Sequence, residues 1–208
     1  MPPPAVDHLV YATPDLDGSV AQMEALTGVR ASPGGRHMGL GTHNALIALG
    51  PDFYLEIIGP DPAQPKPERA RPFGIDTLPM GRLVTWAVKA PGIDERVTAA
   101  KAAGYDPGVV VPLSRDTPDG AHLAWRLTMG VTAGAGLVPF LIDWGSTPSP
   151  ALGAAKGCSL VALRGEHPNP AEAVGPLRAL GISLAITAAP APALIAAIET
   201  PKGLIELR

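Results

Sequence analysis

Apolar and polar positions follow one another along this chain in a fixed order of strand-like and helix-like segments. A short apolar run at residues 7–12 predicts a strand. Leu16, Val20 and Met23 follow at the i, i+4, i+7 spacing of one helix face. Thr13-Pro14-Asp15 predicts an N-cap with Pro at the first helical position, and Gly28 a left-handed stop. Further strand-like runs at 36–41, 44–49 and 53–58 complete a βαβββ unit.

The same order of elements recurs twice more along the chain. A second unit comprises a strand at 83–89, a helix at 93–103 and strands at 109–113, 122–128 and 138–143, with a Thr117-Pro118-Asp119-Gly120 turn. A third comprises a strand at 159–164, a helix starting near Asn169-Pro170, and strands at 182–188, 194–199 and 203–207. We therefore expect an α+β fold in which repeated βαβββ units form an incomplete mixed β-barrel, with a third C-terminal βαβββ-like unit.

The domain boundaries follow from these units. We place the first unit at residues 1–60, a proline-rich linker at 61–82, the second unit at 83–148 and the third at 149–208. Two βαβββ units suffice to form a concave bowl that can hold a ligand. The third unit could extend the sheet, cover the mouth of the bowl or form a dimer contact, and the sequence leaves these alternatives open.

Composition narrows the class of protein. The 208 residues carry 16 basic and 19 acidic side chains without a basic stripe, for a net charge of −3, which argues against nucleic acid as a partner. No apolar stretch is long enough to span a membrane, and the N-terminus lacks the pattern of a signal peptide. The one cysteine, Cys158, fits a reducing compartment and a buried structural thiol. We expect a cytoplasmic protein that acts on a small molecule and can form a homodimer.

One pair of polar residues stands out in the first unit. Strand alternation places His8 on one face of the first strand and Glu56 on one face of the fourth. If these strands are neighbours, His8 and Glu56 face each other across the concave surface, where an imidazole and a carboxylate can bind a divalent metal. The alternative is a neutral His8 that is hydrogen-bonded to Glu56 and joins two strands without metal.

A glycine-rich hairpin at residues 34–44 carries the densest set of polar side chains. Arg36 or His37 is a candidate for binding an anionic or carbonyl substrate, with His43 or Asn44 orienting it. His37 or His43 is a candidate general base, because a histidine titrates near neutral pH. The alternative is a glycine-rich turn whose polar groups are solvated.

The second unit adds candidates for substrate binding. In the strand at 122–128 the Leu/Trp set that includes Trp125 is expected to pack under a helix. This leaves His122 and Arg126 on the concave or exposed face, where Arg126 is either a carboxylate clamp or half of a surface ion pair. Trp86, in an apolar strand, is a core residue or a wall of the pocket.

Three segments together resemble the glyoxalase-like branch of the vicinal-oxygen-chelate superfamily. They are DHLVYATPDLD at 7–17, GGRHMGLGTHNALIALG at 34–50 and YLEIIGPDP at 54–62, with looser matches in GRLVTWAVK and TPDGAHLAWRL. The superfamily includes glyoxalase I, extradiol dioxygenases, epimerases, fosfomycin-resistance thiol transferases and metal-free antibiotic-binding proteins. The resemblance implies a divalent metal that grips two substrate oxygens through ligands on the first and fourth strands of paired units. His8 and Glu56 match the ligand positions of the first unit.

The second unit departs from this pattern. Thr85 falls where His8 does, and Leu141 or Asp143 where Glu56 does, although Asp143 or His122 could supply a third ligand. The resemblance implies a lyase, isomerase or dioxygenase that uses Zn, Ni, Mn or Fe(II) on a small oxygen-rich molecule. The alternative is a metal-free protein that binds or sequesters a small molecule, and the Thr85 departure favours it.

Overall fold

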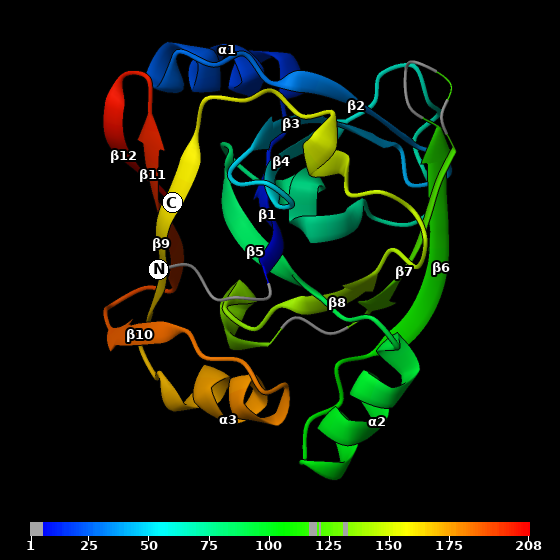
Figure 1. Cartoon of the computed structure of the whole chain (residues 1–208), viewed down its shortest axis with the longest axis vertical. Helices are drawn as coiled ribbons and strands as arrows, with labels where there is room; N and C mark the ends of the chain where they lie inside the picture. The colour runs from blue at the N-terminus through cyan, green and yellow to red at the C-terminus, as the bar shows by residue number, and fades with distance from the viewer. Residues whose placement is uncertain (1–5, 117–119, 121, 131–132) are drawn as a thin grey trace.

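A single curled sheet organises the first two units. The computed structural model describes residues 6–116, 120, 122–130 and 133–208, so most of the predicted turn at 117–120 lies outside the described residues. The sheet has eight strands in the order β2-β3-β4-β1-β5-β8-β7-β6 and curls into a barrel-like wall (Figure 1). The strands are β1 (Val6–Ala12), β2 (Ser32–His37), β3 (Thr42–Ala48), β4 (Tyr54–Pro60), β5 (Arg82–Lys89), β6 (Val109–Asp116), β7 (His122–Met129) and β8 (Phe140–Asp143).

The strand pairing gives the two units the same internal topology. In each unit the first strand pairs in parallel with the last, β1 with β4 and β5 with β8, and an antiparallel pairing of β1 with β5 joins the units. The two edge strands of the sheet, β2 and β6, approach each other on the side of the barrel opposite β1 and β5. There Arg115 donates to the carbonyl oxygen of Gly34 at 2.5 Å. The predicted α+β fold with an incomplete mixed barrel is therefore confirmed.

Helices cover the convex side of this sheet. In α1 (Leu16–Thr27), Leu16, Val20 and Met23 are buried against the sheet, and α2 (Ile93–Ala102) occupies the equivalent place in the second unit. The N-cap of α1 is Asp15, whose side chain accepts from the backbone of Gly18, so the predicted cap with Pro14 inside the helix was wrong.

The strand predicted at 36–41 was also misplaced. The observed strand, β2, ends at His37, because Gly39 and Gly41 adopt left-handed φ values of 79° and 64° and turn the chain into β3. Residues 39–41 therefore belong to a turn rather than to the strand.

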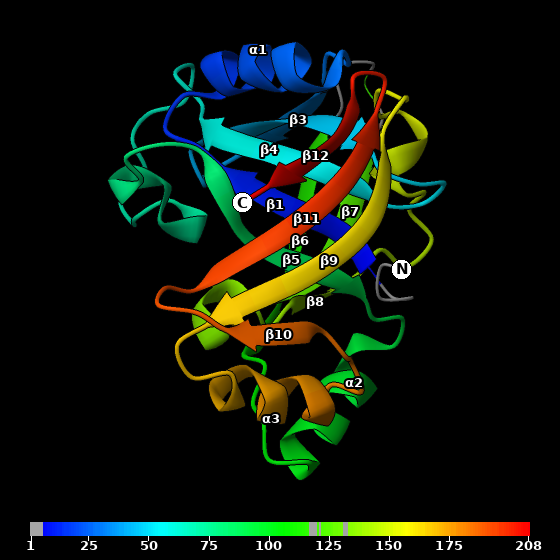
Figure 2. The ribbon, with the colours of Figure 1, turned by 90° about the vertical axis from the view of Figure 1, so that its left-hand side faces the viewer.

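The third unit forms a separate sheet. Its elements are β9 (Ser159–His167), α3 (Ala171–Ala179), β10 (Ala185–Ala188), β11 (Ala193–Thr200) and β12 (Gly203–Leu207). The order of elements is again βαβββ, but the sheet order is β10-β9-β11-β12, so β9 pairs in parallel with β10 and not with its last strand. This sheet packs on the outer face of the β1–β5 junction, below α1 (Figure 2). The sheet of the third unit thus lies outside the barrel, whereas Ala151 and Ala154 pack against Tyr54 and its neighbours on β3.

The segment between the first two units returns to the barrel. It contains the 3₁₀ segment η1 (Pro72–Thr77), and Arg71 ties it to the β2–β3 turn through a 2.8 Å hydrogen bond to the carbonyl oxygen of Gly41. Two further short 3₁₀ segments, η2 (Gly134–Gly136) and η3 (Pro150–Leu152), flank β8. Within the described residues, no helix has the length and apolar character needed to cross a membrane.

Candidate functional site

The concave side of the curled sheet encloses a cavity of about 610 Å³. A cavity of this size suits a small organic molecule. Its polar lining includes His8, His37, Glu56, Arg82 and Thr85. Most of the wall is apolar and aromatic, and the residues used below are Phe73, Trp125, Leu127, Phe140, Ile142 and Trp144.

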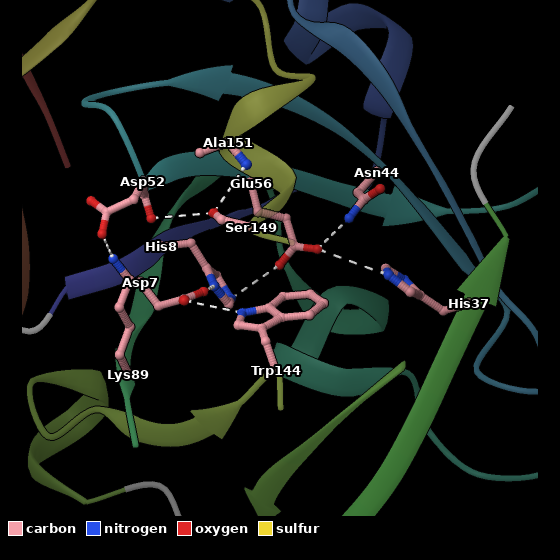
Figure 3. Close-up of polar contacts among 10 residues, drawn as sticks. All are labelled: Asp7, His8, His37, Asn44, Asp52, Glu56, Lys89, Trp144, Ser149 and Ala151. Atoms are coloured by element: carbon pink, nitrogen blue, oxygen red, sulfur yellow. Dashed lines mark hydrogen bonds and ion pairs between the residues drawn. The ribbon is translucent and has the colours of Figure 1, made fainter. Parts of the chain in front are cut away.

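Glu56 on β4 is the centre of the polar contacts (Figure 3). Its Oε1 atom accepts a 2.5 Å hydrogen bond from Asn44 Nδ2 on β3. Its Oε2 atom lies 3.8 Å from His8 Nε2, and Oε1 lies 4.0 Å from His37 Nε2. The structure therefore brings three of the predicted residues together around the buried carboxylate of a fourth, Glu56.

A β-bulge orients His8. The pairing of β1 with β5 shifts register between Val6 and His8, which lets the side chain of Asp7 lie beside that of His8 instead of on the opposite face. His8 Nδ1 is 2.7 Å from one Asp7 oxygen, and the other Asp7 oxygen accepts from Trp144 Nε1 at 3.0 Å. This arrangement favours the tautomer with the proton on Nδ1 and leaves Nε2 facing Glu56 and the cavity.

The residues around His8 shift its pKa and fix the orientation of its imidazole ring. Burial alone would lower the pKa of His8, but the hydrogen bond and charge of Asp7 and the charge of Glu56 outweigh burial and raise it. The imidazole stacks on Tyr54 at 4.9 Å and meets the edge of Phe140 at 5.5 Å between ring centroids. Burial raises the pKa of the Tyr54 phenol well above its usual value, so it stays protonated.

His37 carries the opposite pKa shift. Its Nδ1 is 3.0 Å from Thr42 Oγ1. Burial lowers the pKa of His37, and the nearby charges of Arg115, His43 and His8 lower it further against the opposing effect of Glu56. His37 is therefore a neutral imidazole at neutral pH, whereas the upward shift of the His8 pKa acts in favour of its protonated form.

Two predicted residues of the hairpin lie elsewhere. His43 is half-buried on the face of β3 that it shares with Ala45 and Ile47, which is the convex face under α1. Arg36 forms a 2.7 Å ion pair with Asp61, and this hydrogen bond holds the pKa of Asp61 well below its usual range. Neither His43 nor Arg36 is near Glu56 in the way that His37 and Asn44 are.

The predicted residues of the second unit also point away from the cavity. Trp86 is fully buried and donates to the carbonyl oxygen of Leu137 at 2.9 Å, as a core residue. Arg126 is exposed and forms a two-bonded ion pair with Asp94 of α2, at 2.7 and 2.8 Å, and His122 is exposed on the same strand. Trp125 instead lines the cavity. The prediction that its side of β7 packs under a helix was wrong, because an apolar strand face can equally be the wall of an apolar cavity.

The strand register identifies the second-unit counterparts of His8 and Glu56. Val10 pairs with Glu56 in the first unit, and the equivalent Ala87 pairs with Phe140 in the second. Phe140 therefore stands where Glu56 does, so the prediction of Leu141 or Asp143 at that place was wrong. Asp143 instead accepts from the backbone N–H of Gly92 at the start of α2. Within the described residues, no group of three or more His, Cys, Asp or Glu side chains is arranged to hold a metal.

Three polar residues of the site were missed by sequence reasoning. Asp7 was adjacent to His8, but strict alternation assigned it to the other face. Trp144 follows β8 and reaches Asp7 across the cavity wall. Arg115 lies beyond the end of the predicted strand and is buried near Tyr54 and Glu56, and this burial lowers its pKa.

Known proteins share this fold. Residues 6–181 match the family model described as a glyoxalase-like domain. A hypothetical protein from Staphylococcus aureus superimposes with a TM-score of 0.65 and 16% identity over 90% of this chain and 87% of that one. A methylmalonyl-CoA epimerase in complex with methylmalonyl-CoA gives a TM-score of 0.46 and 19% identity over 70% of this chain and 98% of that one. A methylmalonyl-CoA epimerase from Mycobacterium tuberculosis gives a TM-score of 0.46 and 15% identity over 72% of this chain and 91% of that one. No curated protein matches the chain.

Proposed function

The chain belongs to the glyoxalase-like domain family, and from this premise we propose that it is an isomerase or lyase that moves a proton within a small carbonyl compound. One observation carries the proposal. His8 Nε2 and Glu56 Oε2 face the same cavity 3.8 Å apart, too far to satisfy each other with a hydrogen bond. Each group is held by its own partner, Asp7 for His8 and Asn44 for Glu56.

The two groups have complementary roles. The Glu56 carboxylate accepts the proton from a carbon next to the substrate carbonyl, and the C–H bond breaks. The electron pair of the C–H bond forms the C=C bond of an enolate, and His8, when protonated on both ring nitrogens, donates from Nε2–H to the enolate oxygen, where negative charge develops. Return of the proton to a different carbon gives an isomer, and departure of a leaving group from the neighbouring carbon gives a lyase product.

The cavity wall supports this chemistry. Aromatic and aliphatic side chains such as Trp125, Phe140 and Ile142 exclude water from the reacting groups. Electrostatic interactions are stronger in such an apolar site than in water. Neutral His37, 4.0 Å from Glu56, is placed to accept a proton from that carboxylate and return it at a different carbon.

The metal-dependent lyase, isomerase or dioxygenase implied by the family resemblance would use His8 and Glu56 as ligands. Asp7 on His8 Nδ1 is the kind of partner that a metal-bound histidine has. Catalytic zinc sites, however, use three protein ligands, and the positions that the second unit would contribute hold Thr85 and Phe140. These residues do not fit a resident Zn, Ni, Mn or Fe(II), so the proposed steps use none.

Deuterium exchange tests the proposal directly. We expect the protein, after treatment with a chelator, to speed the incorporation of solvent deuterium at the carbon next to the carbonyl of 2-tetralone or phenylpyruvate. Proton NMR measures this exchange as the loss of the signal of that C–H group. Glu56→Gln and His8→Asn should each slow this exchange by about 10²-fold or more. Glu199→Gln is the matched control, since Glu199 is an exposed carboxylate on β11.

Two results would overturn the proposal. Exchange that is lost on chelation and restored by Zn, Ni, Mn or Fe(II), with a stoichiometric metal that His8→Ala and Glu56→Ala each remove, would establish a metal enzyme. Saturable binding of these ketones without exchange would instead favour the binding or sequestration protein. Metal analysis should use protein purified without a histidine tag.

A further inference from the structure

We propose that the substrate is an elongated apolar molecule with an anionic group, and that Arg82 binds this group at the end of the cavity away from His8. This inference rests on the proposed function for the reacting end of the molecule. It adds the chemical class of the substrate, a carboxylate or sulfonate attached to an apolar body, and the residue that selects it.

Among the described residues that line the cavity, Arg82 is the one arginine or lysine. It begins β5, it is exposed, and its side chain contributes to the cavity lining. In the described part of the chain, no hydrogen bond or ion pair joins the side chain of Arg82 to another residue, although its backbone belongs to the β1–β5 pairing. By contrast, Arg36 is bound to Asp61 and Arg71 to Asp76 near the same end of the barrel. A guanidinium with free donors at a cavity mouth suits bidentate binding of a carboxylate.

The opposite end of the cavity has its charges paired within the protein. His8 lies between Asp7 and Glu56, at 2.7 and 3.8 Å. Buried Arg115 donates to the Gly34 carbonyl oxygen and lies within electrostatic reach of Glu56. An anionic group of the substrate would be repelled by Glu56 at this end, whereas Arg82 attracts it at the other. The charges therefore orient the ligand as well as bind it.

Strand register gives the length of the ligand. His8 pairs with Ala87 and Ala12 pairs with Arg82, so the two ends are four residues apart along β1. At about 3.3 Å per residue this is a separation of roughly 13 Å between the backbone positions. A body the size of two fused rings bridges that separation once the side chains extend toward it.

The wall between the two ends is apolar. A second register shift in the β1–β5 pairing lets both Val84 and Thr85 line the cavity, and Ile58 lines it from β4. The ring of Phe73 in η1 lies beside that of Phe140, with 6.2 Å between the ring centroids, and both rings line this part of the cavity. The substrate thus meets polar groups at its ends and apolar side chains along its body.

A pair of fluorescent probes separates the contribution of charge from that of the apolar body. We choose 8-anilino-1-naphthalenesulfonate and N-phenyl-1-naphthylamine, which share one aromatic frame with and without a sulfonate. The wild-type chain should bind the sulfonate roughly tenfold more tightly than the neutral probe. Arg82→Gln should abolish this difference without weakening the neutral probe, and Arg82→Lys should keep part of it. Arg69→Gln is the control, since Arg69 is an exposed cation of the preceding linker.

Val84→Trp, which fills the cavity beside Arg82, should weaken both probes and so locate their binding. The inference is overturned if Arg82→Gln keeps the preference for the sulfonate, if Arg69→Gln removes it, or if Val84→Trp leaves both affinities unchanged. These titrations need no proton transfer. Loss of deuterium exchange with an intact, Arg82-dependent preference would therefore refute the proposed reaction alone, and exchange without that preference would refute the anionic substrate alone.

Discussion

Replacing Gly34 with alanine should destabilise the protein through Asn44. A Cβ atom on Gly34 would lie 2.1 Å from Asn44 Oδ1 and 2.9 Å from Asn44 Cγ, so the amide must move. Within the described residues, Asn44 Oδ1 is also a buried polar atom without a hydrogen-bond partner, which shows how closely Gly34 packs on this amide. Because Asn44 Nδ2 holds Glu56, moving the amide costs the hydrogen bond to that carboxylate.

The magnitude follows from two opposing effects. A hydrogen bond to a charged group contributes about 1.5–3 kcal/mol. Alanine in place of glycine restricts the unfolded chain and returns about 0.4–1 kcal/mol, since Gly34 lies outside the left-handed region and alanine can adopt its backbone conformation. The net loss is about 1–2 kcal/mol, and the Tm should fall by roughly 2–8 °C.

A double-mutant cycle tests whether the cost passes through Asn44. In the Asn44→Ala background the two clashing side-chain atoms are gone, and the third of the three nearest atoms, the backbone oxygen of residue 44, lies at 3.2 Å. Gly34→Ala should then be neutral or slightly stabilising in urea unfolding followed by tryptophan fluorescence, with an unchanged m-value. An equal cost of Gly34→Ala in both backgrounds would refute the steric coupling between Gly34 and Asn44.

Further predictions concern the histidines and the missing half of a metal site. Because the pKa of His8 is raised, its stabilising contribution is present below the ordinary value of 6.5 and is lost as the pH rises through the folded value. Asp7→Asn should flatten this dependence in urea titrations across about pH 5–9, and an unchanged profile would count against the Asp7 contact. The pKa of His37 is lowered, so its contribution is present above 6.5 and is lost as the pH falls through the folded value. His37→Gln should remove this decrease in stability at low pH. The difference in unfolding free energy between the wild type and the variant, measured at several pH values, checks it. Thr85→His combined with Phe140→Glu should create a four-ligand site with His8 and Glu56, and metal analysis should find stoichiometric zinc in the double variant only; a variant without metal would refute the inferred equivalence of the two units.

The architecture was predictable because it depends on local patterns that repeat. Apolar spacing in α1, glycine at its end and alternation in the strands each specify an element independently of the rest of the chain. The sheet order of the third unit was not predictable in this way. A parallel β9–β10 pair and a parallel β9–β12 pair can be built from the same sequence of elements, and only packing on the outer face of the β1–β5 junction selects the first.

The site was predictable where strands are regular and not where they are bulged. Alternation correctly placed His8 and Glu56 on one surface, and the carboxylate needed buried partners. It could not place Asp7 beside His8, because a bulge adds a residue that no local pattern reveals. His37 and His43 were indistinguishable as bases until the turn at Gly39 and Gly41 fixed which strand and which face each occupies.

The two bulges between β1 and β5 together explain why the cavity is polar on one side and apolar on the other. The bulge at Asp7 adds a carboxylate beside His8, so the first unit gains an imidazole whose ring is oriented by Asp7. The bulge at Val84 adds an aliphatic side chain next to Thr85, the counterpart of His8 in the second unit. Because Phe140 stands where the second unit would place a counterpart of Glu56, Glu56 is the one carboxylate among the described residues that line the cavity. A planar substrate is therefore approached by Glu56 from a single side, which makes removal of one particular hydrogen the expected stereochemical course.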